Sequence, residues 1–281
     1  MRLLVTGAAG MLGQDVVRAA ESAGHDAIAL PRGDLDITDG DSVERVLSAE
    51  RPDAVVNCAA WTDVDGAEEH EAAAHAVNAV GAGHVAAATA AAGARLVHVS
   101  TDYVFDGRAD RPYVESAATA PMSAYGRTKL AGERAVAQAG GRPLIVRSSW
   151  LFGVGGKNFV ATMLALADGR DHVSVVTDQI GCPTWTGHLA PALVALAAQE
   201  QQGAMHVAGA GACSWHELAS EAFRRAGVAC EVRETTTAEM PRPAPRPAYS
   251  VLVSERPDAP RLPDWREGVA GFLAARAGAP A

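Results

Sequence analysis

Tyr125 and Lys129 are four residues apart in a segment whose composition favours a helix. At this spacing the two side chains lie on one face of a helix. A phenol with a pKa of about 10 exchanges protons poorly at neutral pH, whereas a neighbouring ammonium group lowers that pKa. The pair therefore indicates general acid–base catalysis, and Lys129 could also donate to a ribose hydroxyl. An exposed helical pair without a catalytic role is the alternative.

Two hydroxyl side chains, Ser100 and Thr101, stand at the end of an apolar segment that we expect to be a strand. In doubly wound sheets, ligands bind in the crevice at the carboxyl ends of the strands. Either hydroxyl could donate to a substrate carbonyl and to the Tyr125 hydroxyl. Capping of the strand end is the alternative.

A glycine-rich turn follows the first apolar segment, and Gly7, Gly10 and Gly13 have the spacing G-x-x-G-x-x-G. Glycine permits the tight turn, lets the backbone approach a pyrophosphate, and allows the following helix to pack on the strand. The free N–H groups at the start of that helix would bind the pyrophosphate. The turn predicts a nucleotide site rather than a plain structural turn.

The choice of cofactor depends on the residues after the second apolar segment. Arg32 suits the 2′-phosphate of NADP(H), whereas Asp34 and Asp36 could instead serve the ribose or the adenine. A solvated loop charge is an equally valid interpretation of Arg32. We expect NADPH, with NADH as the alternative.

Short apolar segments of strand length alternate with longer helical segments in the first half of the chain. The expected strands are Leu3–Thr6, Ala27–Leu30, Ala54–Asn57, Leu96–Ser100 and Leu144–Arg147. The expected helices are Met11–Ala23, Ser42–Ala49, Ala67–Ala92 and Ala124–Ala139. This alternation predicts an α/β fold with a doubly wound, Rossmann-like parallel sheet.

The second half is less regular and predicts a smaller, substrate-binding part. Its expected elements are a helix at Phe159–Ala167, a strand at Val173–Thr177, a helix at Gly187–Ala198, a strand at Met205–Ala208, a helix at Ser214–Ala226 and a short capped helix after Pro263. The segment Pro241–Pro247 should be extended and exposed. We expect a cofactor domain over residues 1–150 and a substrate domain over residues 151–281, with part of about 186–227 returning to the first.

The composition excludes several classes of partner. The net charge of −9 over 281 residues provides no overall basic field for nucleic acid or anionic lipid. The four cysteines form no C-x-x-C pair, which argues against a zinc site or a disulfide framework, so we expect no metal. No apolar segment approaches the length of a membrane span, and the start does not resemble a signal peptide. A cytoplasmic protein is expected.

Lysine is rare in this chain. Of the 24 basic residues only Lys129 and Lys157 are lysines. Lys157 is a candidate for binding the phosphates of a nucleotide, and a surface position is the alternative. Arg242 and Arg246, among prolines, either contact phosphates or keep a loop soluble, and we favour solubility.

Several motifs together resemble the extended short-chain dehydrogenases/reductases and, among these, the dTDP-4-dehydrorhamnose reductases. The resemblance covers residues 1 to about 190 and weakens beyond. The segments that carry it are Gly7–Gly13, Asn57–Asp65, Ser100–Gly107, Tyr125–Glu133, Arg147–Gly153, Asn158-Phe159 and Asp178–Thr184.

The resemblance implies reduction of the 4-keto group of dTDP-4-dehydro-β-L-rhamnose by NAD(P)H to dTDP-L-rhamnose, with Tyr125 as proton donor. It implies that Lys129 lowers the pKa of Tyr125 and holds the nicotinamide ribose, while Thr101 orients the keto oxygen. The implied cofactor residues also include Gly10, Met11, Leu12, Asp36, Ile37, Ala60, Trp61 and Thr62. The implied sugar-binding residues are Asp102, Tyr103, Trp150 and Asn158. A homodimer is a further expectation.

The chain departs from the family pattern at one position. Some members bind magnesium between subunits with paired carboxylates, and Asp15 matches one of these positions. The other position holds His188, so we expect no such site.

Other activities of the same fold remain to be weighed. A 4,6-dehydratase is disfavoured because Asp102 is followed by Tyr103 where a second carboxylate is needed. A 4-epimerase usually has a longer substrate domain. A reductase of a related dTDP-keto sugar, such as a dihydrostreptose synthase, remains open. A non-catalytic regulatory subunit is disfavoured because Tyr125 and Lys129 are intact.

Overall fold

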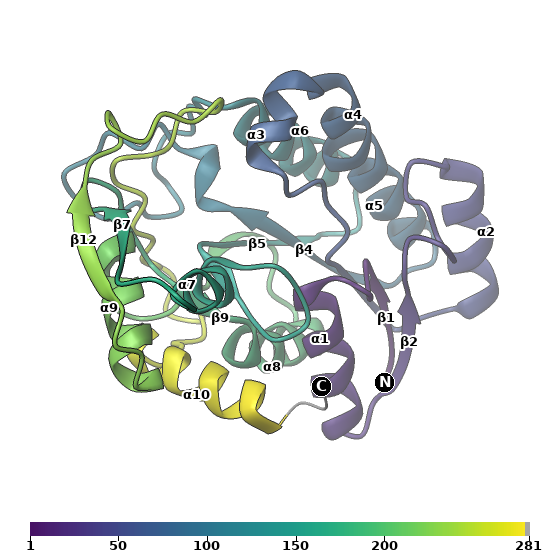
Figure 1. The fold of residues 1–281 in the computed structure, drawn as a ribbon. Coiled ribbons are helices and arrows are strands. Elements are labelled where there is room, and N and C mark those ends of the chain that lie inside the picture. The colour runs from purple at the N-terminus through teal and green to yellow at the C-terminus, as the bar shows by residue number, and fades with distance from the viewer. Residues whose placement is uncertain (279–281) are drawn as a thin grey trace.

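A six-stranded parallel sheet forms the centre of the computed structural model, which describes residues 1–278 (Figure 1). Its strands lie in the order β10 (Gly203–His206), β5 (Leu144–Ser148), β4 (Arg95–Thr101), β3 (Ala54–Asn57), β1 (Arg2–Thr6) and β2 (Asp26–Leu30). The inner strands are continuous buried runs because helices cover both of their faces. The prediction of a doubly wound α/β fold is confirmed.

The direction of winding reverses at the centre of this sheet. From β1 the chain first moves outward to β2 and then crosses to β3, β4 and β5 on the other side. Connections that leave in opposite directions open a crevice beyond the carboxyl ends of the two central strands. The segments that follow Thr6 and Asn57 therefore meet at one edge of the sheet.

Two layers of helices cover the sheet (Figure 1). One layer contains α1 (Met11–Ser22) and α8 (Thr186–Ala197), which pack against each other. The opposite layer contains α2 (Gly40–Glu50), α5 (Ala82–Ala91) and α6 (Ala124–Gln138). Because α8 and β10 belong to this architecture, the chain returns to the first sheet after residue 185.

The expectation of one helix over Ala67–Ala92 is wrong. The segment contains α3 (Val64–Glu69), α4 (Glu71–His75), a π-helical turn η1 (Ala76–Gly81) and then α5. The side chain of Asn78 in η1 bonds the backbone of Trp61 and the hydroxyl of Thr128. Tertiary contacts thus override the uniform helix propensity of this alanine-rich run.

The remaining elements form a smaller part beside the carboxyl edge of the sheet. It contains α7 (Phe159–Leu166), α9 (Trp215–Ala226), α10 (Trp265–Gly278) and the parallel pair β7 (His172–Val176) and β12 (Glu231–Thr235). Short pairs are formed by β6 (Leu151–Phe152) with β9 (Thr184–Trp185) and by β8 (Ile180–Gly181) with β11 (Cys213–Ser214). A 3₁₀ turn, η2 (Asp102–Val104), follows β4. No helix within residues 1–278 has the length and apolarity needed to cross a bilayer.

The segment Pro241–Pro247 is not simply exposed, contrary to the expectation. Ala244 and Pro247 are buried, and a Cβ at Gly107 would lie only 2.5 Å from the Pro247 side chain. Asp65, at the start of α3, pairs with Arg246 at 3.0 Å and accepts a hydrogen bond from the Ala244 N–H at 3.1 Å. The proline segment is therefore attached to α3, and Arg246 is more than a solubilising charge.

Candidate active site

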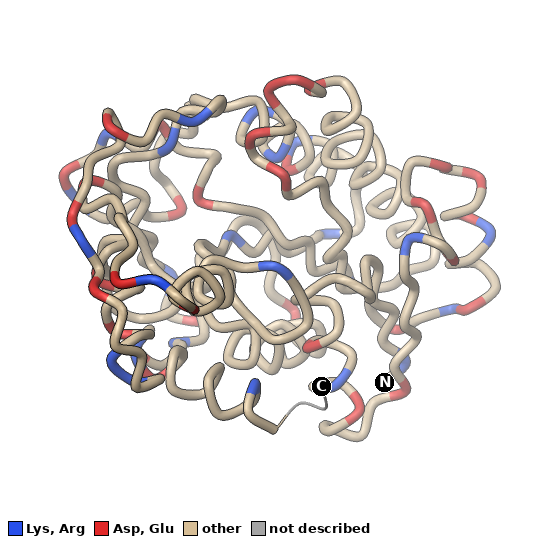
Figure 2. The backbone as a smooth tube through the Cα atoms, in the orientation of Figure 1, with Lys and Arg blue, Asp and Glu red and all other residues tan. Residues whose placement is uncertain are grey.

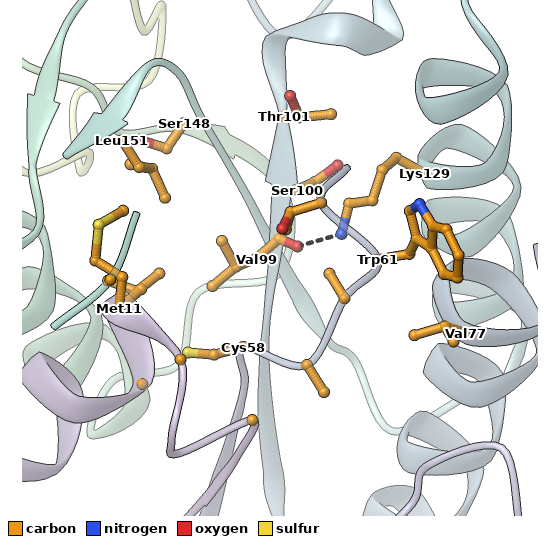
Figure 3. A pocket seen from close by; sticks show the side chains of 18 of the residues that line it. Met11, Cys58, Trp61, Val77, Val99, Ser100, Thr101, Lys129, Ser148 and Leu151 are labelled. Carbon is orange, nitrogen blue, oxygen red and sulfur yellow. Dashed lines mark hydrogen bonds between the residues drawn. The ribbon is translucent and has the colours of Figure 1, made fainter. Parts of the chain in front are cut away.

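A cavity of about 740 Å³ lies at the carboxyl edge of the sheet, where the winding direction reverses. Its volume is within the range of small-molecule sites. Its wall includes the predicted residues Gly7, Gly10, Met11, Leu12, Gly13, Arg32, Asp36, Ile37, Ala60, Trp61, Thr62, Thr101, Asp102, Tyr103, Tyr125, Lys129 and Trp150. Figure 3 shows Met11, Trp61, Thr101 and Lys129 around this space from different elements. Asn158 is the predicted residue that the structure does not place in the wall.

The glycine turn has the geometry that a pyrophosphate site requires. Gly7 has φ +65°, and a Cβ there would lie 2.7 Å from the backbone nitrogen of Ala59. A Cβ at Gly13 would lie 2.3 Å from the Gly7 oxygen. Helix α1 begins after Gly10 with no side-chain cap and no acidic residue in its first turn. Its N–H groups are therefore free to bind an anion, which fits a dinucleotide cofactor.

Arg32 and Asp36 both line the cavity, and Asp36 is held more firmly than Arg32. The carboxylate of Asp36 accepts bonds from the N–H and hydroxyl of Thr38 at 3.0 and 2.8 Å, and these bonds lower its pKa. Its contact with Arg32 is longer, at 3.3 Å, and the Arg32 side chain is 80% exposed. Arg32 can therefore turn to a 2′-phosphate, while Asp36 is held by its own loop.

The loop after β3 lines the cavity, and Asn78 holds this loop in place. The Trp61 N–H donates to Asn78 Oδ1 at 2.8 Å, and Asn78 Nδ2 donates back to the Trp61 carbonyl at 3.1 Å. Gly132 allows α6 to lie close to the backbone of Asn78, because a Cβ at position 132 would lie 2.0 Å from the main-chain oxygen of Asn78. The sequence analysis missed Asn78, whose partners are 17 and 50 positions away.

Tyr125 and Lys129 lie in the first turns of α6, which Ser123 caps by accepting a bond from the Gly126 N–H at 3.2 Å. The Tyr125 ring packs edge-on against Tyr103 with 5.5 Å between centroids. Lys129 Nζ donates to the Val99 carbonyl of β4 at 2.8 Å (Figure 3). The predicted pair thus faces the cavity from one helix.

The protonation of this pair differs from the expectation. Burial raises the pKa of Tyr125 to about 12, while the Thr101 hydroxyl lowers it in part. Burial also lowers the pKa of Lys129 to about 8, against the attraction of Glu133. The phenol therefore keeps its proton at neutral pH. A protonated phenol is the form that a proton donor requires.

Thr101 and Asp102 form the end of β4 at the centre of the cavity. The Thr101 hydroxyl donates to Asp102 Oδ1 at 3.0 Å. Asp102 is 2% exposed, and its Oδ2 has no hydrogen-bond partner within residues 1–278. Burial raises the pKa of Asp102 to about 6, while the neighbouring hydroxyls of Ser250 and Thr101 lower it. A buried acceptor without a partner is unusual in folded proteins, and Asp102 is one of the residues that line the cavity.

The structure distinguishes the two candidate hydroxyls. Ser100 donates to Glu133 Oε1 at 2.6 Å, and Glu133 forms a buried ion pair with Arg147 at 2.7 Å. Ser100 is thus engaged in a network beneath α6, and Thr101 is the hydroxyl beside Tyr125. Glu133 follows Lys129 by one helical turn, which is the signal that could have predicted its place. Arg147 had no comparable local signal.

Trp150 forms one wall of the cavity together with Trp215, which the sequence analysis missed. The two indoles are stacked with 3.5 Å between centroids and an angle of 2° between planes. Trp150 has φ 49°, and a Cβ at Gly181 would lie 2.4 Å from its ring. Trp215 Nε1 donates to Gln179 at 3.0 Å. The pair provides a fixed aromatic surface for a ligand.

Asn158 has a structural role in the loop between β6 and α7. Its Nδ2 donates to the carbonyls of Gly153 and Gly156 at 2.7 and 3.0 Å, and its Oδ1 caps α7 at Ala161. Its neighbour Lys157 lines the cavity instead.

The two residues at the positions of the possible magnesium site, Asp15 and His188, contact other side chains. Asp15 pairs with Arg18, and the ring of His188 packs edge-on against Trp185 at 4.6 Å. Within residues 1–278 no group of three or more potential ligands from His, Cys, Asp and Glu is gathered.

Comparison with known proteins gives consistent matches over the whole chain. A family model described as RmlD substrate binding domain matches residues 1–277. A dTDP-4-dehydrorhamnose reductase from Streptomyces griseus is 47% identical over 292 residues, covering 99% of this chain and 96% of the relative. A dTDP-4-keto-6-deoxy-D-glucose reductase from Streptomyces niveus is also 47% identical, over 253 residues that cover 89% of this chain and 88% of the relative.

A solved structure matches equally well. The structure of dTDP-4-dehydrorhamnose reductase from Bacillus anthracis in complex with NADP has a TM-score of 0.95 and 38% identity. The match covers 98% of this chain and 99% of that one.

Proposed function

The chain belongs to the RmlD substrate binding domain family, and we propose from this premise that it reduces the 4-keto group of dTDP-4-dehydro-β-L-rhamnose with NADPH to give dTDP-L-rhamnose. The family resemblance expected from the motifs is confirmed. The name of the Streptomyces griseus relative and the NADP in the Bacillus anthracis structure support this substrate and cofactor. The observation that carries the proposal is that Thr101, Tyr125 and Lys129 line the same cavity as the glycine turn.

The residues of the cavity divide into three binding regions in this proposal. The N–H groups at the start of α1 bind the cofactor pyrophosphate, and Arg32 binds the 2′-phosphate. Lys129 binds the nicotinamide ribose from its place at the Val99 carbonyl. Trp150 and Asp102, which both line the cavity, bind the sugar. The cofactor, when bound, supplies the hydride.

The chemical step of the protein is a proton transfer. The Thr101 hydroxyl turns from Asp102 to the keto oxygen and orients that oxygen towards Tyr125. Tyr125 holds its proton because burial raises its pKa to about 12. The sugar alkoxide is a stronger base than a phenolate, so the Tyr125 proton moves to the keto oxygen as negative charge develops there. The Lys129 ammonium then stabilises the phenolate from the same face of α6.

The test is NADPH consumption with a panel of dTDP-4-keto-6-deoxy sugars, followed at the absorbance of the reduced nicotinamide. We expect turnover with dTDP-4-dehydro-L-rhamnose at a higher kcat/KM than with any other sugar of the panel. Absence of turnover with every sugar, in a protein that binds NADPH, would refute a reductase.

A second candidate substrate is favoured by one observation. The Streptomyces niveus relative has the same identity to this chain and a name with a different sugar, dTDP-4-keto-6-deoxy-D-glucose. Both sugars present a 4-keto group to the same donor and differ in the configuration of the ring. The panel distinguishes them by the ratio of the two kcat/KM values.

The proposal includes a cytoplasmic setting and a homodimer. Cys58, Cys182, Cys213 and Cys230 are all free thiols, which suits a reducing compartment. The homodimer rests on the family resemblance alone, and its test is the mass of the purified protein in solution by light scattering.

A further inference from the structure

Lys157 lies in a loop that is fixed in shape before any ligand binds. The loop joins β6 to α7, and Asn158 holds it by donating to the carbonyls of Gly153 and Gly156. Asn158 is 8% exposed, so these bonds are shielded from water. The backbone that carries Lys157 is therefore preorganised.

This loop is attached to the glycine turn rather than to the sugar side of the cavity. Gln14 Nε2 donates to the Ala9 carbonyl at 2.8 Å and to the Gly155 carbonyl at 3.0 Å, joining the two loops. A Cβ at Gly156 would lie 2.9 Å from the Cβ of Met11, the first residue of α1. Lys157 is thus next to a residue that contacts the start of α1.

Lys157 also differs from the other cations in the cavity wall. Arg32 pairs with Asp36, and Lys129 donates to the Val99 carbonyl from a buried position. Lys157 is exposed at the wall and, among residues 1–278, its ammonium forms no ion pair and no hydrogen bond. Unlike Arg32 and Lys129, Lys157 therefore gives up no existing bond when it binds an anion.

We infer that Lys157 binds the diphosphate of the dinucleotide cofactor from the side opposite the glycine turn. This inference rests on the proposed function for the identity of the cofactor. The N–H groups of α1 approach the diphosphate from one side, and a lysine acts on phosphate as a point charge from the other. The dTDP diphosphate has the same chemistry, but the joint through Gln14 and Met11 places Lys157 over the cofactor's half of the cavity.

The test measures the affinity of the protein for NADPH and NADH without any sugar nucleotide, by calorimetry. Lys157→Ala should weaken both dinucleotides by roughly ten-fold, because both contain the diphosphate. Arg32→Ala should weaken NADPH alone, since only NADPH has a 2′-phosphate. Lys157→Arg should restore most of the affinity, and the loss should shrink at high salt. Arg134→Ala, an exposed charge on α6 outside the cavity, is the matched control and should change neither affinity.

Two results would overturn the inference. One is an unchanged dinucleotide affinity in Lys157→Ala with an unchanged melting temperature. The other is a loss of affinity for dTDP, measured by the same calorimetry, with unchanged affinity for NADPH and NADH. This result would assign Lys157 to the substrate. The proposed function fails separately, when the wild-type protein binds NADPH and reduces no keto sugar.

Discussion

Tyr125 is held in its protonated form by its surroundings, and this single property determines its role. Burial and the negative charge of Asp102 raise its pKa, so the phenol donates a proton only to a strong base. Thr101 is the neighbour that both contacts Asp102 and lowers the pKa of Tyr125. At the scale of the residue, these contacts support the proposed role of Tyr125 in protonating an alkoxide.

Removal of the Tyr125 hydroxyl gives the first prediction. Tyr125→Phe keeps the ring against Tyr103 but loses the proton, so kcat should fall by about 10² to 10⁴. The affinity for NADPH should remain within about two-fold, which shows that the loss is chemical. A rate within a few-fold of the wild type would remove Tyr125 from the mechanism.

Asp102 makes stability depend on pH. Its folded pKa of about 6 lies above the ordinary value of 3.8, so the folded state binds this proton more tightly than the unfolded state. The free energy of unfolding therefore decreases as the pH rises from about 4 through about 6, by up to roughly 3 kcal/mol.

The variant Asp102→Asn tests this dependence, because it cannot ionise. Its stability relative to the wild type should increase between pH 4 and pH 7 by roughly 2 to 3 kcal/mol in denaturant titrations. Parallel curves for the two proteins across this range would contradict the raised pKa.

At the scale of elements, the contact between η1 and α6 positions the loop after β3, which contains Trp61. Gly132 brings the two backbones together, and Asn78 transmits the position of η1 to Trp61. The π-helical turn thus directs the side-chain amide of Asn78 towards the backbone of Trp61, in the loop after β3.

Gly132→Ala should therefore be strongly destabilising. The new Cβ would lie 2.0 Å from the Asn78 oxygen, and overpacking of this kind costs about 2 kcal/mol or more. Gly83→Ala in α5 is the matched control, since its Cβ would meet Ala135 at an ordinary 3.4 Å and alanine favours a helix. Equal effects of the two changes on the midpoint of urea unfolding would contradict this account of η1.

The elements that the sequence predicted are those specified by local patterns. The parallel strands, the glycine turn and the Tyr125–Lys129 spacing each depend on a few adjacent residues. The π-helical turn depends on Thr128, 50 positions from Asn78, and the indole stack joins Trp150 to Trp215, which is 65 positions away. Such contacts form only in the folded chain, so no local sequence pattern predicts them.

At the scale of the whole molecule, a chain with a net charge of −9 must bind two anionic ligands. Figure 2 shows basic and acidic positions interspersed along the backbone rather than separated into two regions. The wall of the cavity contains the cations Arg32, Lys129 and Lys157. The proline segment adds Arg246 behind this wall, where it pairs with Asp65 close to Tyr103.

The proline segment should matter for the substrate rather than for the cofactor. Arg246→Ala breaks the 3.0 Å pair with Asp65 and should raise the KM for the sugar nucleotide by roughly three- to ten-fold, with NADPH affinity unchanged. Arg242→Ala is the matched control, because its side chain is 61% exposed and 3.8 Å from Asp65. An equal rise in KM for both variants would show that the pair with Asp65 has no special role.

The central claim is that this cavity delivers a hydride to the 4-keto carbon of a dTDP-6-deoxy sugar. The most direct measurement is turnover of dTDP-4-dehydro-L-rhamnose with NADPH deuterated at the transferred position, followed by NMR of the product. The account predicts one deuterium at C4 of a sugar with the rhamno configuration. Unlabelled product, deuterium at another carbon, or no product from a protein that binds NADPH would contradict it.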